Sequence, residues 1–297
     1  MKTGAFFQDA QELDQLLINF KNGVYDYVND KLLPHSSQYP FQYTLDVDYN
    51  PDAVCPIWDS LMENITVKRK HIQDALEEFL GFCISDMEYD KYNKALILDG
   101  GGSNGKSTII RFMEKLVGRR NCSSVAVSEI GDNRFLVSTM ENKLINFSEE
   151  EPRSIFAKTG TFKKLTGGSP LFSEMKGKQG KSIESRTKLV MTYNEMPILK
   201  DTSKGMLRRL MILPFDLDLE TTPWLKISHI TEKLEYEKEG VILRAIEGLK
   251  RLENQKGFTR IPESEQKIEE MIVESDAVME WANDYLTFTD NEKDFVS

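Results

Sequence analysis

The chain has 297 residues, of which 40% are hydrophobic and 29% charged, as is typical of a globular protein with a buried core. These fractions exclude collagen, a largely disordered chain and a small disulfide-stapled protein. Uncharged apolar runs fall far short of the roughly 20 residues of a membrane span, and no secretory signal is visible. The three cysteines, Cys55, Cys83 and Cys122, lie far apart, which argues against a disulfide framework or a cysteine zinc site. We therefore expect a cytoplasmic location.

Charge is distributed unevenly along the chain. The formal net charge is −10, with 38 Lys and Arg against 48 Asp and Glu, which argues against a protein that coats nucleic acid with its whole surface. Residues 152–190, however, carry nine basic and two acidic side chains, whereas residues 260–297 carry three basic and eleven acidic ones. The basic middle is where an anionic polymer could bind.

Residues 1–57 predict an N-terminal accessory region of mixed α and β structure. A short helical pattern covers Ala10–Phe20, and Asn19–Gly23 reads as a turn. Two strand-like runs, residues 24–28 and 31–33, flank Asn29-Asp30 and predict a hairpin.

Residues 58–88 predict a helical region that leads into the core, with Gly81 as a helix end. Short apolar runs then alternate with helical patterns over residues 89–220, which predicts an α/β core with a mainly parallel sheet. The expected strands cover residues 95–98, 143–147, 189–193 and 210–215, and a helix is expected over 108–117. Residues 221–297 return to helical periodicity and predict a C-terminal helical region.

Residues 100–107 match the phosphate-binding motif G-x-x-x-x-G-K-[ST] at every fixed position, between an expected buried strand and an expected helix. Glycines let backbone N–H groups turn toward a β-phosphate, and the helix N-terminus adds its positive dipole end. Lys106 would neutralise the β- and γ-phosphates of ATP, and Ser107 would hold Mg²⁺. The predicted nucleotide-binding residues are Gly100, Gly101, Gly102, Ser103, Asn104, Gly105, Lys106, Ser107 and Thr108.

Hydrolysis also needs a carboxylate near the metal ion and one that activates water. The apolar run at residues 143–147 ends in Glu149, Glu150 and Glu151, which supply such groups at a strand end. Glu149 is the first choice for both metal binding and catalysis, and Glu150 is a second catalytic candidate. Spacing does not separate the three.

Two further apolar runs have candidate functional residues at one end. Asn194 ends the run at residues 188–193, where it could orient a water molecule or contact the γ-phosphate, or simply start a turn. Arg208 and Arg209 precede the run at 210–215. They could be a solvated loop, or they could reach the γ-phosphate of a neighbouring subunit in a ring. Spacing leaves both choices open.

Taken in order, these motifs resemble the superfamily 3 helicases of phage, plasmid and poxvirus primase–helicases. The resemblance rests on the phosphate-binding motif, the strand ending Phe-Ser-Glu149, Lys164-Leu-Thr-Gly-Gly168, Lys188-Leu-Val-Met-Thr-Tyr-Asn194 and the segment Leu207–Phe215. It covers the chain from about Asn19 to about Phe258. It implies an AAA+-like core in a hexameric ring that hydrolyses ATP with Mg²⁺ and moves on single-stranded DNA.

The resemblance also assigns residues by motif. It implies that Glu149 is the acidic residue of the second motif, Asn194 the sensor asparagine, and Arg208 or Arg209 an arginine finger acting in trans. The loop between Gly168 and Lys181 falls where the family places a DNA-contacting hairpin. Its basic residues, and the predicted DNA-binding residues, are Lys176, Lys178 and Lys181.

Two departures shape the expected partners. No primase signature is visible, so a primase or polymerase module is expected in the same or a partner chain. Residues 290–297 look like part of a linker, so we expect the helicase portion of a longer replication protein. An alternative is a nucleotide-dependent DNA-binding ring that loads or anchors replication proteins without unwinding, and a third reading is a small-molecule kinase.

Overall fold

The computed structural model describes residues 17–285, apart from residues 40, 86, 88, 131–133, 150, 152–154, 157–158 and 175–178. Its centre is a five-stranded sheet in the order β12-β4-β10-β6-β5. All of its pairings are parallel. The strands are β4 (Ala95–Asp99), β5 (Cys122–Ser123), β6 (Ile145–Ser148), β10 (Lys188–Tyr193) and β12 (Leu210–Pro214).

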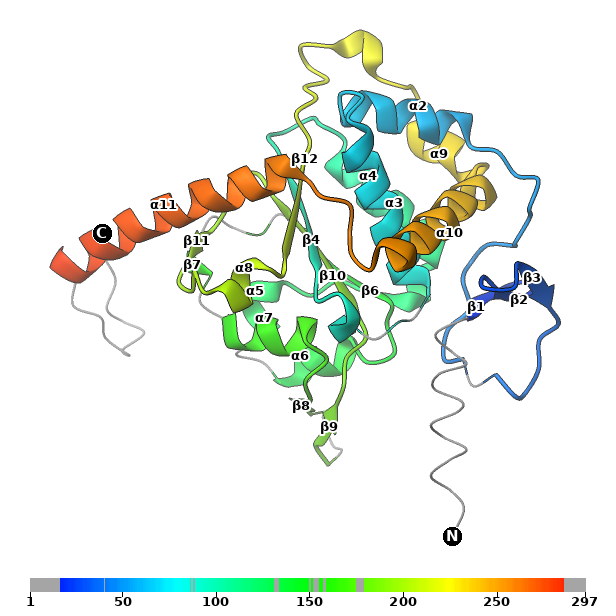
Figure 1. Ribbon diagram of the computed structural model, residues 1–297, viewed down its shortest axis with the longest axis horizontal. Helices are drawn as coiled ribbons and strands as arrows, with labels where there is room; N and C mark the ends of the chain where they lie inside the picture. Colours follow the sequence, from blue (N-terminus) through cyan, green and yellow to red (C-terminus); the bar gives the residue numbers. More distant parts are fainter. Residues whose placement is uncertain are drawn as a thin grey trace.

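This sheet confirms the predicted α/β class with a parallel core. Its central strands are buried along almost their whole length, as expected of strands covered on both faces. In Figure 1, α2, α3, α4, α9 and α10 gather on one side of the sheet and α5 to α8 on the other. The four longer strands fall within a residue or two of the expected runs.

The N-terminal region contains a separate antiparallel sheet of three strands. They are β1 (Leu17–Phe20), β2 (Gly23–Asp26) and β3 (Lys31–Leu33), in the order β1-β2-β3. The predicted hairpin is confirmed, but the helical prediction for Ala10–Phe20 is wrong at residues 17–20, and residues 1–16 lie outside the described part. The strand conformation is favoured at residues 17–20 because Leu17, Ile18 and Phe20 are all buried, whereas a helix would bury one face only.

Two long helices, α3 (Lys70–Ile84) and α10 (Lys238–Gln255), cross at very short range. Gly81 lies inside α3, so its prediction as a helix end is wrong. A Cβ atom at Gly81 would lie 2.3 Å from the Ala245 carbonyl oxygen, and one at Gly248 would lie 2.5 Å from the Glu77 carbonyl oxygen. The two glycines let the backbones meet. α3 and α10, which lie far apart in the sequence, therefore join in one helical layer.

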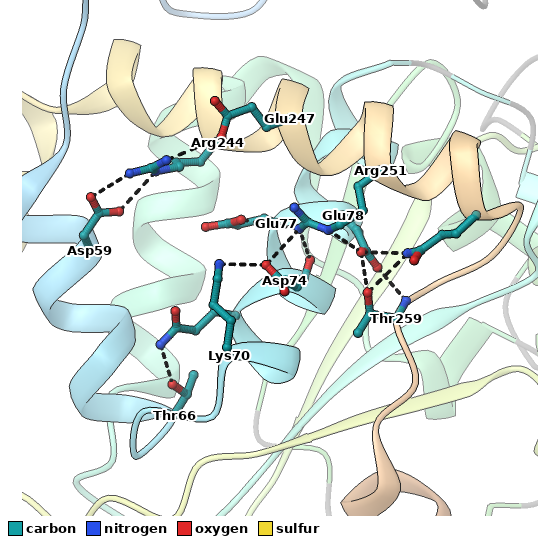
Figure 2. Close-up of polar contacts among 12 residues, drawn as sticks. Asp59, Thr66, Lys70, Asp74, Glu77, Glu78, Arg244, Glu247, Arg251 and Thr259 are labelled. Carbon is teal, nitrogen blue, oxygen red and sulfur yellow. Dashed lines mark hydrogen bonds and ion pairs between the residues drawn. The ribbon is translucent and has the colours of Figure 1, made fainter.

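A polar network, shown in Figure 2, ties α10 to α2 and α3. The Glu78 side chain is fully buried and accepts hydrogen bonds from Arg251 Nε (2.7 Å), Gln255 Nε2 (2.9 Å) and the Thr259 backbone N–H (2.7 Å). Arg244 on α10 donates to both oxygens of Asp59 on α2, at 3.2 and 2.9 Å. The bonds to Glu78 are made by a buried carboxylate, whereas the Arg244–Asp59 pair is partly exposed. Together they hold α10 against α2 and α3.

The remaining elements connect or flank this framework. α11 packs against β12 and β11 and extends away from the rest of the molecule in Figure 1. None of the described helices is long and apolar enough to cross a bilayer. The remaining strands are β7 (Ile155–Phe156), β8 (Leu171–Ser173), β9 (Lys181–Ile183) and β11 (Ile198–Leu199). The remaining helices are α2 (Pro56–Ile65), η1 (Tyr89–Lys91), α4 (Lys106–Val117), η2 (Arg119–Asn121), α5 (Val127–Ile130), α6 (Arg134–Thr139), α7 (Thr159–Thr166), α8 (Lys204–Leu207), η3 (Pro223–Leu225), α9 (Ile230–Glu235) and α11 (Pro262–Tyr285).

Candidate functional site

Residues 100–105 form a glycine-rich loop between β4 and α4, and Lys106 and Ser107 are the first two residues of α4. Gly100 must be glycine, because a Cβ atom there would lie 2.3 Å from Asn104 Nδ2 and 2.5 Å from the Phe215 carbonyl oxygen. Gly105 adopts a φ of +93°, a left-handed conformation that favours glycine, and is the N-cap of α4. The strand, loop and helix thus have the arrangement that the sequence predicts.

The Lys106 side chain bends back over this loop. Its Nζ donates to the carbonyl oxygen of Gly100, to that of Gly101 at 2.7 Å and to Asn194 Oδ1 at 3.2 Å. Lys106 is 88 positions from Asn194 in sequence, yet the carboxyl ends of β4 and β10 lie side by side, with Asp99 opposite Tyr193. Two residues predicted independently therefore meet at one edge of the sheet.

A cavity of about 500 Å³ opens beside the loop. This volume falls within the range of small-molecule sites in proteins. Ser107 and Thr108, in the first turn of α4, line it together with Asn194. The full lining is Gly101, Gly102, Ser103, Asn104, Gly105, Lys106, Ser107, Thr108, Thr192, Asn194, Leu219, Glu220 and Lys226.

The three glutamates after β6 have different surroundings. Glu151 is buried, and its carboxylate accepts hydrogen bonds from the Val127 N–H at 2.6 Å and from the Ser148 hydroxyl. It thereby holds the start of α5. Glu149 is exposed at the same edge of the sheet, beyond the described lining of the cavity, and Glu150 lies outside the described residues. The geometry thus gives Glu151 a structural role and leaves Glu149 available.

The predicted metal ligands are oxygen donors, as Mg²⁺ prefers. Ser107 presents an exposed hydroxyl, and Glu149 presents an exposed carboxylate. Across the described residues, no cluster of three or more His, Cys, Asp or Glu side chains gathers. This donor set fits Mg²⁺, which proteins usually bind through one or two carboxylates and the substrate's phosphates rather than through a full protein cage.

The two arginines before β12 also have different surroundings. Arg209 is 8% exposed; its Nε donates to Thr166 Oγ1 at 2.8 Å and its Nη1 to the Gly205 carbonyl oxygen. Burial, with a smaller contribution from the adjacent Arg208 charge, lowers the pKa of the Arg209 guanidinium. Arg208 is exposed. Arg209 is therefore engaged within its own chain, whereas Arg208 faces outward.

The arginines lie at the opposite edge of the sheet from the glycine-rich loop. The Arg209 carbonyl oxygen accepts from Ala95 N–H at 2.8 Å, and Leu210 pairs with Ala95 where β4 begins. The loop follows Asp99, where β4 ends. The five residues of β12 span about 16 Å, so neither arginine reaches the cavity of its own chain without a large rearrangement.

The predicted basic loop begins and ends in a hairpin. β8 and β9 pair antiparallel, with Leu171 opposite Ile183. Lys181 is exposed and forms an ion pair of 2.5 Å with Glu141. Lys176 and Lys178 lie outside the described residues.

The chain is similar to two protein-family models and to viral proteins. Residues 5–67 match the family model described as "D5 N terminal like", and residues 98–209 match a family of unknown function, DUF5906. "Putative helicase L207/L206" of Acanthamoeba polyphaga mimivirus is 24% identical over 263 residues, which cover 80% of this chain and 24% of that protein. "Putative helicase 121R" of Invertebrate iridescent virus 3 is 24% identical over 227 residues, 71% of this chain and 24% of that protein.

These matches support the predicted resemblance to phage- and poxvirus-type primase–helicases. The chain spans about a quarter of the length of the curated relatives that it matches. Two solved structures of the NrS-1 C-terminal region share the fold, each at 16% sequence identity. Their TM-scores are 0.58 and 0.54; the matches cover 80% and 69% of this chain and 58% and 49% of those chains.

Sequence reasoning missed part of the lining of this cavity. Thr192 could have been found, since it lies near the end of the same buried strand that leads to Asn194. Leu219, Glu220 and Lys226 line the cavity as well, but they follow β12 in an irregular segment without a motif. Only the fold brings this segment against the glycine-rich loop.

Proposed function

We propose that this chain is the ATP-hydrolysing motor of a superfamily 3 DNA helicase. ATP with Mg²⁺ would bind in the cavity beside the glycine-rich loop, which then acts as a P-loop in an AAA+-like core. The meeting of Lys106 and Asn194 at this cavity carries the proposal, because it joins a phosphate-binding cation to a polar group that can orient water.

Each side chain has a defined task in this mechanism. Lys106 leaves the carbonyl oxygens that it now contacts and binds the β- and γ-phosphates, while loop N–H groups and the start of α4 stabilise their negative charge. Asn194 accepts a hydrogen bond from the attacking water, and Glu149 takes its proton. Ser107 and Glu149 would hold Mg²⁺, which supplies further charge neutralisation on the phosphates. Glu150 remains a second candidate for the base.

The position of the arginines supports a site completed by a second copy. Arg208 is exposed, and it lies at the sheet edge remote from its own cavity. In a ring built from head-to-tail contacts, that edge of one subunit can face the cavity of the next. Arg208 of one subunit would then stabilise the charge of the transition state in its neighbour. Arg209, held by Thr166 and Gly205, would support the segment that presents it.

The proposed polymer is single-stranded DNA. A ring that encloses it needs basic side chains in the lumen, and the β8–β9 hairpin with Lys176, Lys178 and Lys181 would supply them. Hydrolysis in successive subunits would shift these hairpins along the strand. A hexamer, a primase or polymerase module as partner, and action in the cytoplasm of a host cell complete the proposal.

Steady-state ATP hydrolysis by the purified chain tests this function. We expect turnover that requires Mg²⁺, rises with single-stranded DNA and increases per subunit as the protein concentration increases. Lys106→Ala should reduce turnover by at least about 100-fold, because the cation on the transferred phosphate is lost. Arg111→Ala, an exposed change on the same helix, is the matched control and should leave turnover unchanged. Equal turnover in the Lys106→Ala variant would overturn the assignment.

A further inference from the structure

The chain that leaves β12 runs directly along the glycine-rich loop. The Leu219 N–H donates to the Ser103 carbonyl oxygen at 3.1 Å, and the Ser103 hydroxyl donates to Glu220 Oε1 at 2.9 Å. In Figure 1 this segment, with η3 at its far end, projects beyond α2 and α4 before the chain returns to α9. We call residues 215–226 the strap.

A tight turn shapes the strap and brings two charged side chains back to one cavity. The Glu220 N–H donates to Asp218 Oδ1 at 2.8 Å, and the Thr222 N–H donates to the Asp218 carbonyl oxygen at 2.9 Å. After η3, Lys226 follows. Glu220 and Lys226 are both exposed, and both line the cavity that also contains Lys106.

The two strap charges have opposite consequences for a polyphosphate in that cavity. Glu220 carries a negative charge and repels phosphate oxygens, whereas Lys226 attracts them. Glu220 is also the acceptor for the Ser103 hydroxyl, so this contact stabilises the glycine-rich loop. A bound polyphosphate would weaken the Glu220–Ser103 contact because it repels the Glu220 carboxylate. It would favour a position of the strap in which Lys226 lies nearer to the phosphates.

We propose that the strap exchanges partners when a nucleoside polyphosphate binds, an inference that rests on the nucleotide-binding function proposed above. Glu220 accepts the hydrogen bond from the Ser103 hydroxyl and leaves it as the phosphates enter. Lys226 then provides a second cation to the phosphates, in addition to Lys106. The strap thereby couples occupancy of the cavity to the position of the segment between β12 and α9.

The two strap residues should change affinity in opposite directions. Lys226→Gln removes an attractive charge and should weaken binding about tenfold, whereas Glu220→Gln removes a repulsive charge and should strengthen it about threefold. Both positions are exposed, so the fold should be unaffected. A purely structural role of the strap would instead make both variants bind more weakly.

Isothermal titration of the full chain with ATPγS and Mg²⁺ measures these affinities. Lys233→Gln and Glu232→Gln on the neighbouring α9 are matched exposed controls and should bind as the wild type does. Wild-type affinity in both strap variants, or a shift of both affinities in the same direction, would contradict the proposed exchange of partners by the strap. The proposed nucleotide binding would still stand. Failure of the wild-type chain to bind ATPγS would overturn the proposed function and the strap together.

Discussion

Arg208 and Arg209 are adjacent in sequence and belong to opposite environments. The Arg209 guanidinium is buried on Thr166 Oγ1 and the Gly205 carbonyl oxygen, whereas Arg208 is exposed. In the proposed ring, Arg208 acts on the neighbour's nucleotide and Arg209 on the stability of its own chain.

Replacing each arginine with alanine should separate these roles. Arg208→Ala should lower ATP turnover by about 10³-fold or more, as expected for a lost arginine finger, with little change in the free energy of unfolding. Arg209→Ala should lower the free energy of unfolding by about 1–3 kcal/mol, since it leaves buried acceptors without a donor. Turnover assays and urea unfolding measure the two effects. The reverse pattern would assign the finger to Arg209.

Alanine variants of Glu149 and Glu151, which follow β6, should also separate a catalytic role from a structural one. Glu149→Ala should reduce turnover by about 100-fold or more through loss of the base, while nucleotide binding persists. Glu151→Ala should instead lower the free energy of unfolding by about 1–3 kcal/mol, because the Val127 N–H loses its buried acceptor. Nucleotide titration and unfolding curves of both variants provide the check. Full turnover by Glu149→Ala would point to Glu150.

At the scale of single residues, spacing points to groups of neighbouring candidates but does not distinguish the members of each group. The motif pattern predicted three carboxylates after one strand and two arginines before another, and it could not choose between neighbours. The choice depends on Val127, Thr166 and Gly205, which lie far away in sequence or on other elements. Those contacts form only in the folded chain.

Secondary structure was predicted best where burial is complete. A parallel strand covered on both faces needs a continuous apolar run, and such runs marked β4, β6, β10 and β12. β1 was predicted as helix because Leu17, Ile18 and Phe20 satisfy either pattern over four residues. The strand order β12-β4-β10-β6-β5, which sets Asn194 beside Lys106, could not be obtained from local patterns.

The crossing of α3 and α10 makes Gly81 a packing residue rather than a helix end. Gly81→Ala should lower the free energy of unfolding by about 1–3 kcal/mol, because the added methyl group meets the Ala245 backbone and the Leu249 side chain. Gly160→Ala on α7 is the matched control, with nothing within 4 Å of the added Cβ, and should be neutral or mildly stabilising. Chemical unfolding of both proteins measures the difference. A Gly81→Ala protein as stable as the wild type would show that the helix crossing accommodates the added methyl group.

In the whole molecule, the candidate functional residues lie at two opposite edges of the central sheet. Lys106, Asn194 and the cavity lie at the carboxyl ends of the strands, and Arg208 lies where β12 begins. The family resemblance and the α/β fold agree with the sequence-based expectation, whereas ring size, DNA binding and the roles of individual residues stay predictions. Because the cavity and Arg208 of one chain lie so far apart, we propose that a single chain is an incomplete catalyst and that its activity depends on a second copy.

Mixing two inactive variants tests that dependence most directly. The Lys106→Ala chain retains Arg208, and the Arg208→Ala chain retains an intact loop, so each variant alone should be inactive. If a neighbour completes the site, an equimolar mixture should recover turnover, up to about a quarter of the wild-type value for random assembly in a head-to-tail ring. A mixture as inactive as its two components, under conditions where the chains assemble together, would contradict a site shared between subunits.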